Sequence, residues 1–177
     1  MLVIHTISTA DTEDFLEIYQ SLNATVLVNP SKSECKQAIM NEANKIILIG
    51  HGTENGLLNE RLDGYLIDSK MVHLLRDKEI IGIWCNASNF ADRYDLKGFF
   101  TSMFISNKKE LVECGFQLFE NCDTELVKQN HIFATRINNL LLSGTSISEW
   151  PALLFNSLSN EEEKFVYYNY EAMCSLN

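Results

Sequence analysis

Two uninterrupted apolar runs constrain the fold of this chain more than any other feature of its sequence. Residues 45–49 (KIILI) and 79–84 (EIIGIW) consist almost entirely of large apolar side chains, and polar or small residues follow each run. A strand with one solvent-facing side alternates apolar and polar residues, whereas a strand covered on both sides does not. The two runs therefore predict inner strands of a parallel sheet with helices on both faces.

The residues before and between these runs alternate between strand and helix patterns. Residues 2–7 form a β-branched run, and apolar residues at helical spacing follow it up to Leu22. Residues 24–28 predict a second strand, and Ser31 to Glu34 has the pattern of a capping box that opens a helix. With a helix over residues 71–75, four βα units follow one another, which predicts an α/β fold.

The C-terminal part of the chain is predicted to be rich in helix. Residues 99–105 predict a fifth strand, residues 108–119 and 124–142 predict helices, and a further helix is expected from Asn160 onward. No stretch rich in proline, glycine or serine divides the chain, and no internal repeat is present. We therefore expect a single domain over residues 1–177.

Composition excludes several classes of function. The 24 acidic and 14 basic residues give a formal net charge of -10, which argues against a nucleic-acid partner because phosphate binding needs concentrated Lys and Arg. No apolar run approaches the ~20 residues that span a bilayer, and the apolar start is too short for a signal peptide. The five cysteines form no CxxC pair. We expect a cytoplasmic protein without membrane contact, disulfide framework, metal or cofactor.

One histidine and one cysteine follow the two apolar runs. His51 lies two residues after the first run and Cys85 directly after the second. Ligands of an open parallel sheet bind at the carboxyl ends of its strands, and the ends of neighbouring strands lie about 5 Å apart. If the two runs are neighbours, the imidazole and the thiol can cooperate directly, because an adjacent imidazole can take the thiol proton. Gly52 adds a backbone N–H that a developing oxyanion can approach closely.

The segments ILIGHG (47–52) and IIGIWC (80–85), with the histidine before the cysteine, resemble the paired motifs of the caspase-like (clan CD) cysteine peptidases. The resemblance covers roughly residues 1–106. It implies a sheet with His after the third strand and Cys after the fourth, His51 as acid/base and Cys85 as nucleophile. It also implies an oxyanion hole formed by the N–H groups of Gly52 and Cys85, and a protein or peptide as substrate.

The chain departs from the family pattern, and this leaves other functions open. Trp84 stands where the family usually has a small residue, and the helical C-terminal part does not resemble the family's substrate-binding strands. A catalytically inactive caspase-like domain that binds a protein is therefore the main alternative. A Rossmann-like small-molecule binder would need a GxGxxG motif, which this chain does not contain. A histidine phosphatase would need an arginine at the position of Gly50.

The remaining histidines and cysteines, and further candidates for lining the cleft, are expected to have structural roles. His5 and His73 are expected to be structural or solvated, and His131 lies in a helical stretch with no obvious partner. Cys35, Cys114, Cys122 and Cys174 fall at helical positions and are expected to pack in the core. Asn86, Ser88 and residues 101–106 are further candidates for lining the cleft, although each is more typical of a loop cap or a strand face.

Overall fold

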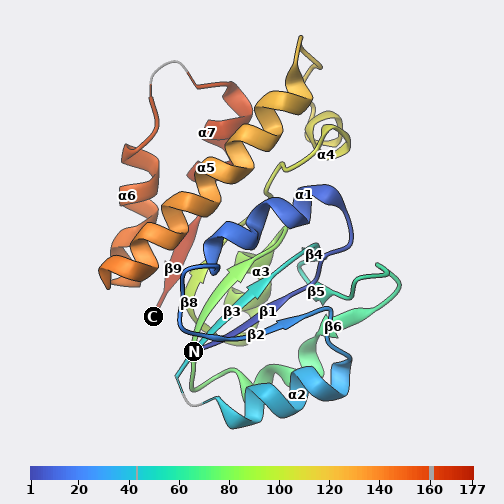
Figure 1. Ribbon diagram of the computed structural model, residues 1–177, viewed down its shortest axis with the longest axis vertical. Coiled ribbons are helices and arrows are strands. Elements are labelled where there is room, and N and C mark those ends of the chain that lie inside the picture. The colour runs from blue at the N-terminus through green and yellow to red at the C-terminus, as the bar shows by residue number, and fades with distance from the viewer. Residues whose placement is uncertain (43, 160–161) are drawn as a thin grey trace.

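A six-stranded sheet forms the centre of the protein, with helices on both of its faces (Figure 1). The computed structural model describes residues 1–42, 44–159 and 162–177. The strand order is β2-β1-β3-β7-β8-β9, and all neighbours are parallel except β8 and β9. The strands are β1 (Leu2–His5), β2 (Thr25–Val28), β3 (Lys45–Ile49), β7 (Glu79–Ile83), β8 (Lys97–Phe100) and β9 (Cys174–Leu176). The predicted α/β class with a mainly parallel sheet is confirmed.

The two apolar runs of the sequence are the inner strands β3 and β7. They pair directly, with Ile47 opposite Ile81 and Ile49 opposite Ile83. Because successive side chains of a strand point to opposite faces, each strand contributes to two separate cores. Ile47 and Ile49 belong to one core, whereas Ile46 and Leu48 belong to the other, and all four are fully buried.

Two groups of helices cover the two faces, as the sequence predicted. One face is covered by α1 (Ala10–Glu13), the 3-10 helices η1 (Asp14–Ile18) and η3 (Ile147–Glu149), α5 (Cys122–Ser143), α6 (Trp150–Asn156) and α7 (Lys164–Glu171). The other is covered by α2 (Lys32–Asn41), the 3-10 helix η2 (Ser69–Leu74) and α3 (Ala87–Tyr94). Ser31 and Glu34 form the predicted capping box at the start of α2.

A small second sheet follows β3, and the sequence did not predict it. It consists of β4 (Gly52–Thr53), β5 (Gly56–Leu58) and β6 (Tyr65–Ile67), all antiparallel. Leu57 and Ile67 are fully buried and pack into the same core as α2 and α3. The glycine-containing loop after His51 is thus the first strand of a hairpin that lies against the main sheet.

The C-terminal predictions need several corrections. The fifth strand is β8, which ends at Phe100, so residues 101–107 form a loop that leads to the short helix α4 (Lys108–Glu113). The long helix is α5, and the expected tail helix is α7, whose predicted start at residues 160–161 lies outside the described residues. Cys174 is not helical, because the chain ends in strand β9 at the sheet edge.

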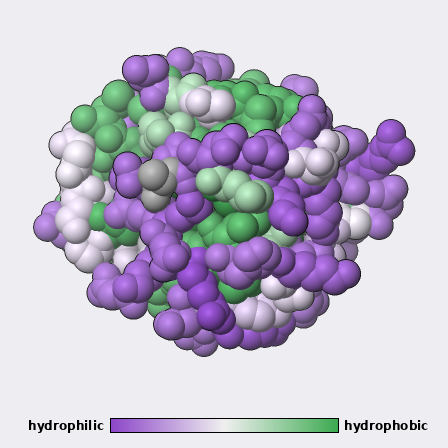
Figure 2. Space-filling model, turned by 90° about the horizontal axis from the view of Figure 1, so that it is seen from below, coloured by the Kyte–Doolittle hydropathy of each residue, from purple (hydrophilic) through white to green (hydrophobic). Residues whose placement is uncertain are grey.

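The face seen in Figure 2 is largely hydrophilic, with an apolar patch near its centre. A groove beside α2 is lined by both kinds of residue, including Leu2, Leu27 and Gln37. Among the described residues, no helix combines the length and the apolar composition needed to cross a bilayer.

Candidate active site

His51 and Cys85 lie side by side at the carboxyl edge of the main sheet. One residue separates His51 from the end of β3 and one residue separates Cys85 from the end of β7, and these strands are hydrogen-bonded neighbours. The next residue, Asn86, has a left-handed backbone with φ of 65°, a conformation that asparagine adopts more readily than most residues. The chain therefore turns sharply after Cys85 and enters α3.

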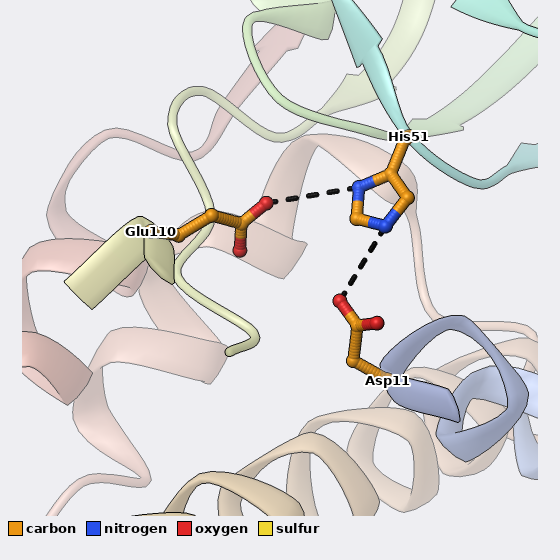
Figure 3. A group of neighbouring side chains, drawn as sticks. All are labelled: Asp11, His51 and Glu110. Atoms are coloured by element: carbon orange, nitrogen blue, oxygen red, sulfur yellow. Dashed lines mark ion pairs between the residues drawn. The ribbon is translucent and has the colours of Figure 1, made fainter. Parts of the chain in front are cut away.

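The N-cap and the first turn of α1 hold one nitrogen of the His51 ring. The Thr9 hydroxyl lies 2.8 Å from His51 Nε2, and Asp11 Oδ2 lies 3.5 Å from the same nitrogen (Figure 3). β1 is the other neighbour of β3, so its carboxyl end reaches the same edge of the sheet. These contacts fix the orientation of the ring and place an acceptor at Nε2.

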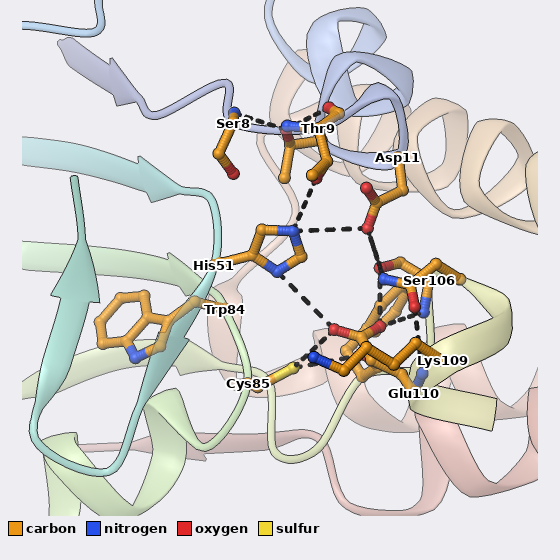
Figure 4. A network of polar contacts seen from close by, with 12 residues as sticks. Ser8, Thr9, Asp11, His51, Trp84, Cys85, Ser106, Lys109 and Glu110 are labelled. Atoms are coloured by element: carbon orange, nitrogen blue, oxygen red, sulfur yellow. Dashed lines mark hydrogen bonds and ion pairs between the residues drawn. The ribbon is translucent and has the colours of Figure 1, made fainter. Parts of the chain in front are cut away.

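Glu110, from α4, faces the other nitrogen of the ring. Its Oε1 lies 3.7 Å from His51 Nδ1 and 3.8 Å from Cys85 Sγ (Figure 4). Within the described part of the chain, His51 and Cys85 share no direct hydrogen bond, and the carboxyl group of Glu110 bridges them instead. The direct cooperation expected from the sequence is therefore absent in this conformation, although both side chains are at the expected edge.

The electrostatics of the Asp11–His51 pair favour a carboxylate and an imidazolium. Burial acts to raise the pKa of Asp11, but hydrogen bonds from His51, Ser106, Thr9 and Asn107 outweigh it and hold that pKa well below its usual range. The hydrogen bond with Asp11 raises the pKa of His51 despite partial burial, and the charges of Asp11 and Glu110 add to the effect. Asp11 is therefore the residue that most favours the charged form of the ring and orients it.

Ser106 links the two carboxyl groups of the site. Its Oγ lies 2.6 Å from Asp11 Oδ2 and 2.8 Å from Glu110 Oε2, and its backbone N–H donates to Glu110 Oε2 at 2.8 Å. A serine hydroxyl has one proton, so both short contacts are favourable together when one carboxyl group is protonated. Burial raises the pKa of Glu110, partly against the hydrogen bonds from Ser106, whereas the pKa of Asp11 is lowered, so Glu110 is the carboxyl group of the two that binds a proton more readily.

The thiol of Cys85 is surrounded by acceptors. Its Sγ donates to the Phe104 carbonyl at 3.4 Å and to Glu110 Oε1 at 3.8 Å. Burial, followed by the charge of Glu110, raises the pKa of Cys85 to about 12. A thiolate in this position would face these two oxygen atoms, so the conformation favours the protonated thiol.

Gly52 has a packing role that the sequence did not show. A Cβ at Gly52 would lie 2.1 Å from Trp84 Cδ1, and the Trp84 ring donates from Nε1 to the Thr53 carbonyl at 3.1 Å. Because His51 O accepts from Leu58 N, the opposed pair Gly52 and Leu57 is a non-hydrogen-bonded pair of the β4–β5 ladder. The Gly52 N–H therefore points away from β5, which leaves it available as an oxyanion donor.

Asp11, His51 and Glu110 also have the composition of a metal site. One ligand atom from each residue lies within 4.8 Å of the others. However, Asp11 approaches Nε2 while Glu110 approaches Nδ1, and an imidazole binds a metal ion through one of these nitrogens (Figure 3). The arrangement is suited to proton transfer through the ring more than to metal binding.

The other sequence candidates divide into two groups. Ser106 belongs to the site, whereas Asn86 and Ser88 donate backbone N–H groups to Ser102 O and Thr101 O and so anchor the loop after β8. Thr101 is buried and hydrogen-bonds the backbone of Trp84, so it is structural. Outside the site, His5 is buried and His73 is exposed, as expected.

His131 and Cys114 differ from the sequence expectation. His131 does have partners, because its ring lies 3.6 Å from Asp14 and 3.2 Å from Glu17. Cys114 is the C-cap of α4 and not a residue inside the helix, whereas Cys122 is helical and buried in the core, as expected. Neither cysteine contacts His51 in the described structure.

Sequence reasoning missed Thr9, Asp11 and Glu110. The first two follow β1, so the rule that places ligands at the carboxyl ends of parallel strands was a usable signal for them. Glu110 had no such signal, because it lies in a helix ten residues after the end of β8.

No protein-family model, no curated protein and no solved structure matches this chain.

Proposed function

We propose that this protein is a cysteine peptidase of the caspase-like type, with Cys85 as nucleophile and His51 as acid/base. The observation that carries the proposal is the position of the two side chains at the carboxyl ends of adjacent parallel strands, β3 and β7. The resemblance implies this placement of the histidine and the cysteine. The partly buried, charge-paired His51 adds to the argument, because perturbed pKa values are typical of catalytic groups.

The arrangement of donors and acceptors is consistent with acyl transfer. Thr9 and Asp11 occupy Nε2, which leaves Nδ1, the nitrogen that faces Glu110, as the one available to act on Cys85. When the ring is neutral with its proton on Nε2, Nδ1 takes the thiol proton and the thiolate attacks the carbonyl carbon of the scissile peptide bond. The Gly52 and Cys85 N–H groups stabilise the oxyanion, and His51 then protonates the departing amine. Water hydrolyses the thioester and restores the thiol.

Asp11 has a positioning role in this mechanism. Its carboxylate holds the Nε2 side of the ring and stabilises the imidazolium that forms after the thiol loses its proton. Thr9 and Ser106 in turn hold Asp11 or the ring in place. The site is thus a histidine–cysteine dyad with an orienting carboxylate.

A protein-binding domain without catalytic activity is the second candidate. Two observations favour it: Glu110 stands between the dyad members, and the pKa of Cys85 is raised to about 12. This candidate expects the same fold with a thiol that no substrate activates.

Cleavage of a peptide library, read by mass spectrometry, tests the peptidase proposal. We expect specific cleavages by the wild-type protein that disappear in Cys85→Ala and His51→Ala and persist in Cys114→Ala, a control at another partly buried cysteine. Cleavage that survives Cys85→Ala would refute the assignment of the nucleophile. A lack of cleavage together with a Cys85 thiol that does not respond to His51→Ala would favour the binding domain.

A further inference from the structure

Glu110 occupies the point at which the two members of the dyad would meet. Its Oε1 is nearly equidistant from His51 Nδ1, at 3.7 Å, and from Cys85 Sγ, at 3.8 Å. Figure 4 shows the carboxyl group reaching this point from α4, while His51 and Cys85 extend from the ends of the sheet strands. A single side chain from a peripheral helix thus separates the nucleophile from its base.

The position of Glu110 is fixed by the residues that precede it. Asn107 caps α4 by accepting from the Glu110 backbone N–H at 3.0 Å. The backbone N–H and the hydroxyl of Ser106 both contact Glu110 Oε2 at 2.8 Å. Ser106 and Asn107 also donate to Asp11 Oδ2, at 2.6 and 2.9 Å. The carboxyl group is therefore held by the same network that orients His51.

With Glu110 in place, the site has no room for a substrate. The cavity bounded by His51, Cys85, Phe104 and Glu110 has a volume of about 10 Å³. This is roughly the space that one water molecule needs. A peptide carbonyl group is larger, so it reaches Cys85 only after the carboxyl group has moved.

Glu110 also keeps the thiol in its unreactive form. Cys85 Sγ is in contact with the Phe104 carbonyl and with Glu110, and both partners accept the thiol proton. His51 Nδ1, which would take that proton, faces Glu110. The same side chain therefore excludes the substrate and interrupts the transfer of the proton.

We propose that Glu110 is an internal inhibitor of the site, whose carboxyl group fills the substrate position between His51 and Cys85 and must be displaced before the dyad can react. This inference rests on the proposed function, because it assigns a resting state to the proposed dyad. The remaining buried contact of α4 is Leu111, whereas Lys108, Lys109, Val112 and Glu113 face solvent. The helix is thus a short, peripheral element that Leu111 anchors to the core.

The test compares the wild type with variants in the rate at which iodoacetamide alkylates Cys85 at pH 7. Peptide mass spectrometry gives this rate separately for each cysteine. Glu110→Ala empties the position, and Glu110→Gln fills the same space without charge. Glu113→Gln is the matched control, because Glu113 is an exposed carboxyl group on the same helix. Each protein is also made with His51→Ala, and thermal melting establishes that each is folded.

We expect Cys85 to be alkylated at least about tenfold faster in Glu110→Ala than in the wild type or in Glu113→Gln. The reason is that each unit by which the thiol pKa falls raises the thiolate fraction tenfold. Glu110→Gln should show a smaller gain, and His51→Ala should abolish both gains. If Glu110→Ala does not fold, Glu110→Gln carries the comparison, and an unchanged rate in that variant overturns the inference.

The remaining outcomes separate the inference from the proposed function. A wild-type Cys85 that already reacts rapidly, depends on His51 and gains nothing from Glu110→Ala overturns the inhibitory role but leaves the dyad intact. A gain in Glu110→Ala that persists with His51→Ala shows that the histidine does not act on the thiol. That result overturns the proposed function and the inference together.

Discussion

Acidification should destabilise the protein through His5. This residue is the last of β1, is fully buried, and its Nδ1 lies 2.9 Å from the hydroxyl of Tyr19. Burial lowers the pKa of His5 from 6.5 to about 4, because a charged imidazole loses its hydration in the core. The folded protein therefore holds His5 neutral at pH values at which the unfolded chain binds a proton.

The sign and size of the effect follow from this difference. A lowered folded pKa means that the contribution of His5 is fully present above pH 6.5 and is lost as the pH falls toward 4. A shift from 6.5 to about 4 corresponds to about 2 kcal/mol lost between pH 7 and pH 5, and to about 3 kcal/mol once the pH is below both values. Such losses are a large part of the 5–15 kcal/mol by which domains are typically stable.

Urea denaturation at pH 7, 6 and 5 measures this loss. His5→Asn keeps a polar atom near the position of Nδ1 and does not titrate in this range, so its free energy of unfolding should fall less with acidification than that of the wild type. His73→Asn is the matched control, because His73 is exposed in η2 and folding leaves it in water. All other titrating groups are common to the three proteins, so the difference between their pH slopes isolates His5.

Equal pH slopes in the wild type and His5→Asn would refute the reasoning. They would mean that the folded protein accommodates a charged His5, by admitting water or by moving Tyr19. Because β1 leads into the segment that carries Thr9 and Asp11, a movement of this kind would also alter the orientation of His51.

Two further predictions concern the site. Asp11→Asn should lower the pKa of His51, because the carboxylate that stabilises the imidazolium is removed; NMR titration of the His51 ring protons measures this pKa. Asp14 faces His131 and not His51, so Asp14→Asn should leave the pKa of His51 unchanged. Gly52→Ala should cost about 1 to 3 kcal/mol in urea denaturation, because the added Cβ would meet Trp84 Cδ1 at 2.1 Å. A fully stable Gly52→Ala protein would show that the indole moves freely.

The local patterns of the sequence were sufficient to predict the central strands of the sheet. They failed for segments whose secondary structure depends on pairing with residues far away in the chain. β3 and β7 were recognisable because strands buried on both faces lack alternating polar residues: after Lys45 and Glu79 at their starts, both strands contain only apolar residues and Gly82. By contrast, β9 pairs with β8 from the far end of the chain, and its three residues have no distinctive pattern. Residues 101–105 have an apolar composition similar to that of a strand, yet Ile105 is held in a loop by both ends of the Asn169 amide.

The position of Trp84 also depended on tertiary contacts. It departs from the family pattern, but the structure accommodates it by packing the indole over Gly52 and hydrogen-bonding it to Thr53. The space for a tryptophan before Cys85 is therefore provided by a glycine 32 positions earlier. Only the pairing of β3 with β7 brings these two residues together.

The sequence by itself determined the alternation of strands and helices, the two central strands, and the placement of His51 and Cys85 at one edge of the sheet. These features depend on local periodicity and on the direction of parallel strands, both of which are written in short segments. Only the tertiary structure decided that Asp11 holds the imidazole and that Glu110 separates it from the thiol. The physical reason is that these contacts join residues 25 to 59 positions apart, whose meeting depends on how β1 and α4 pack against the sheet and not on the residues around them.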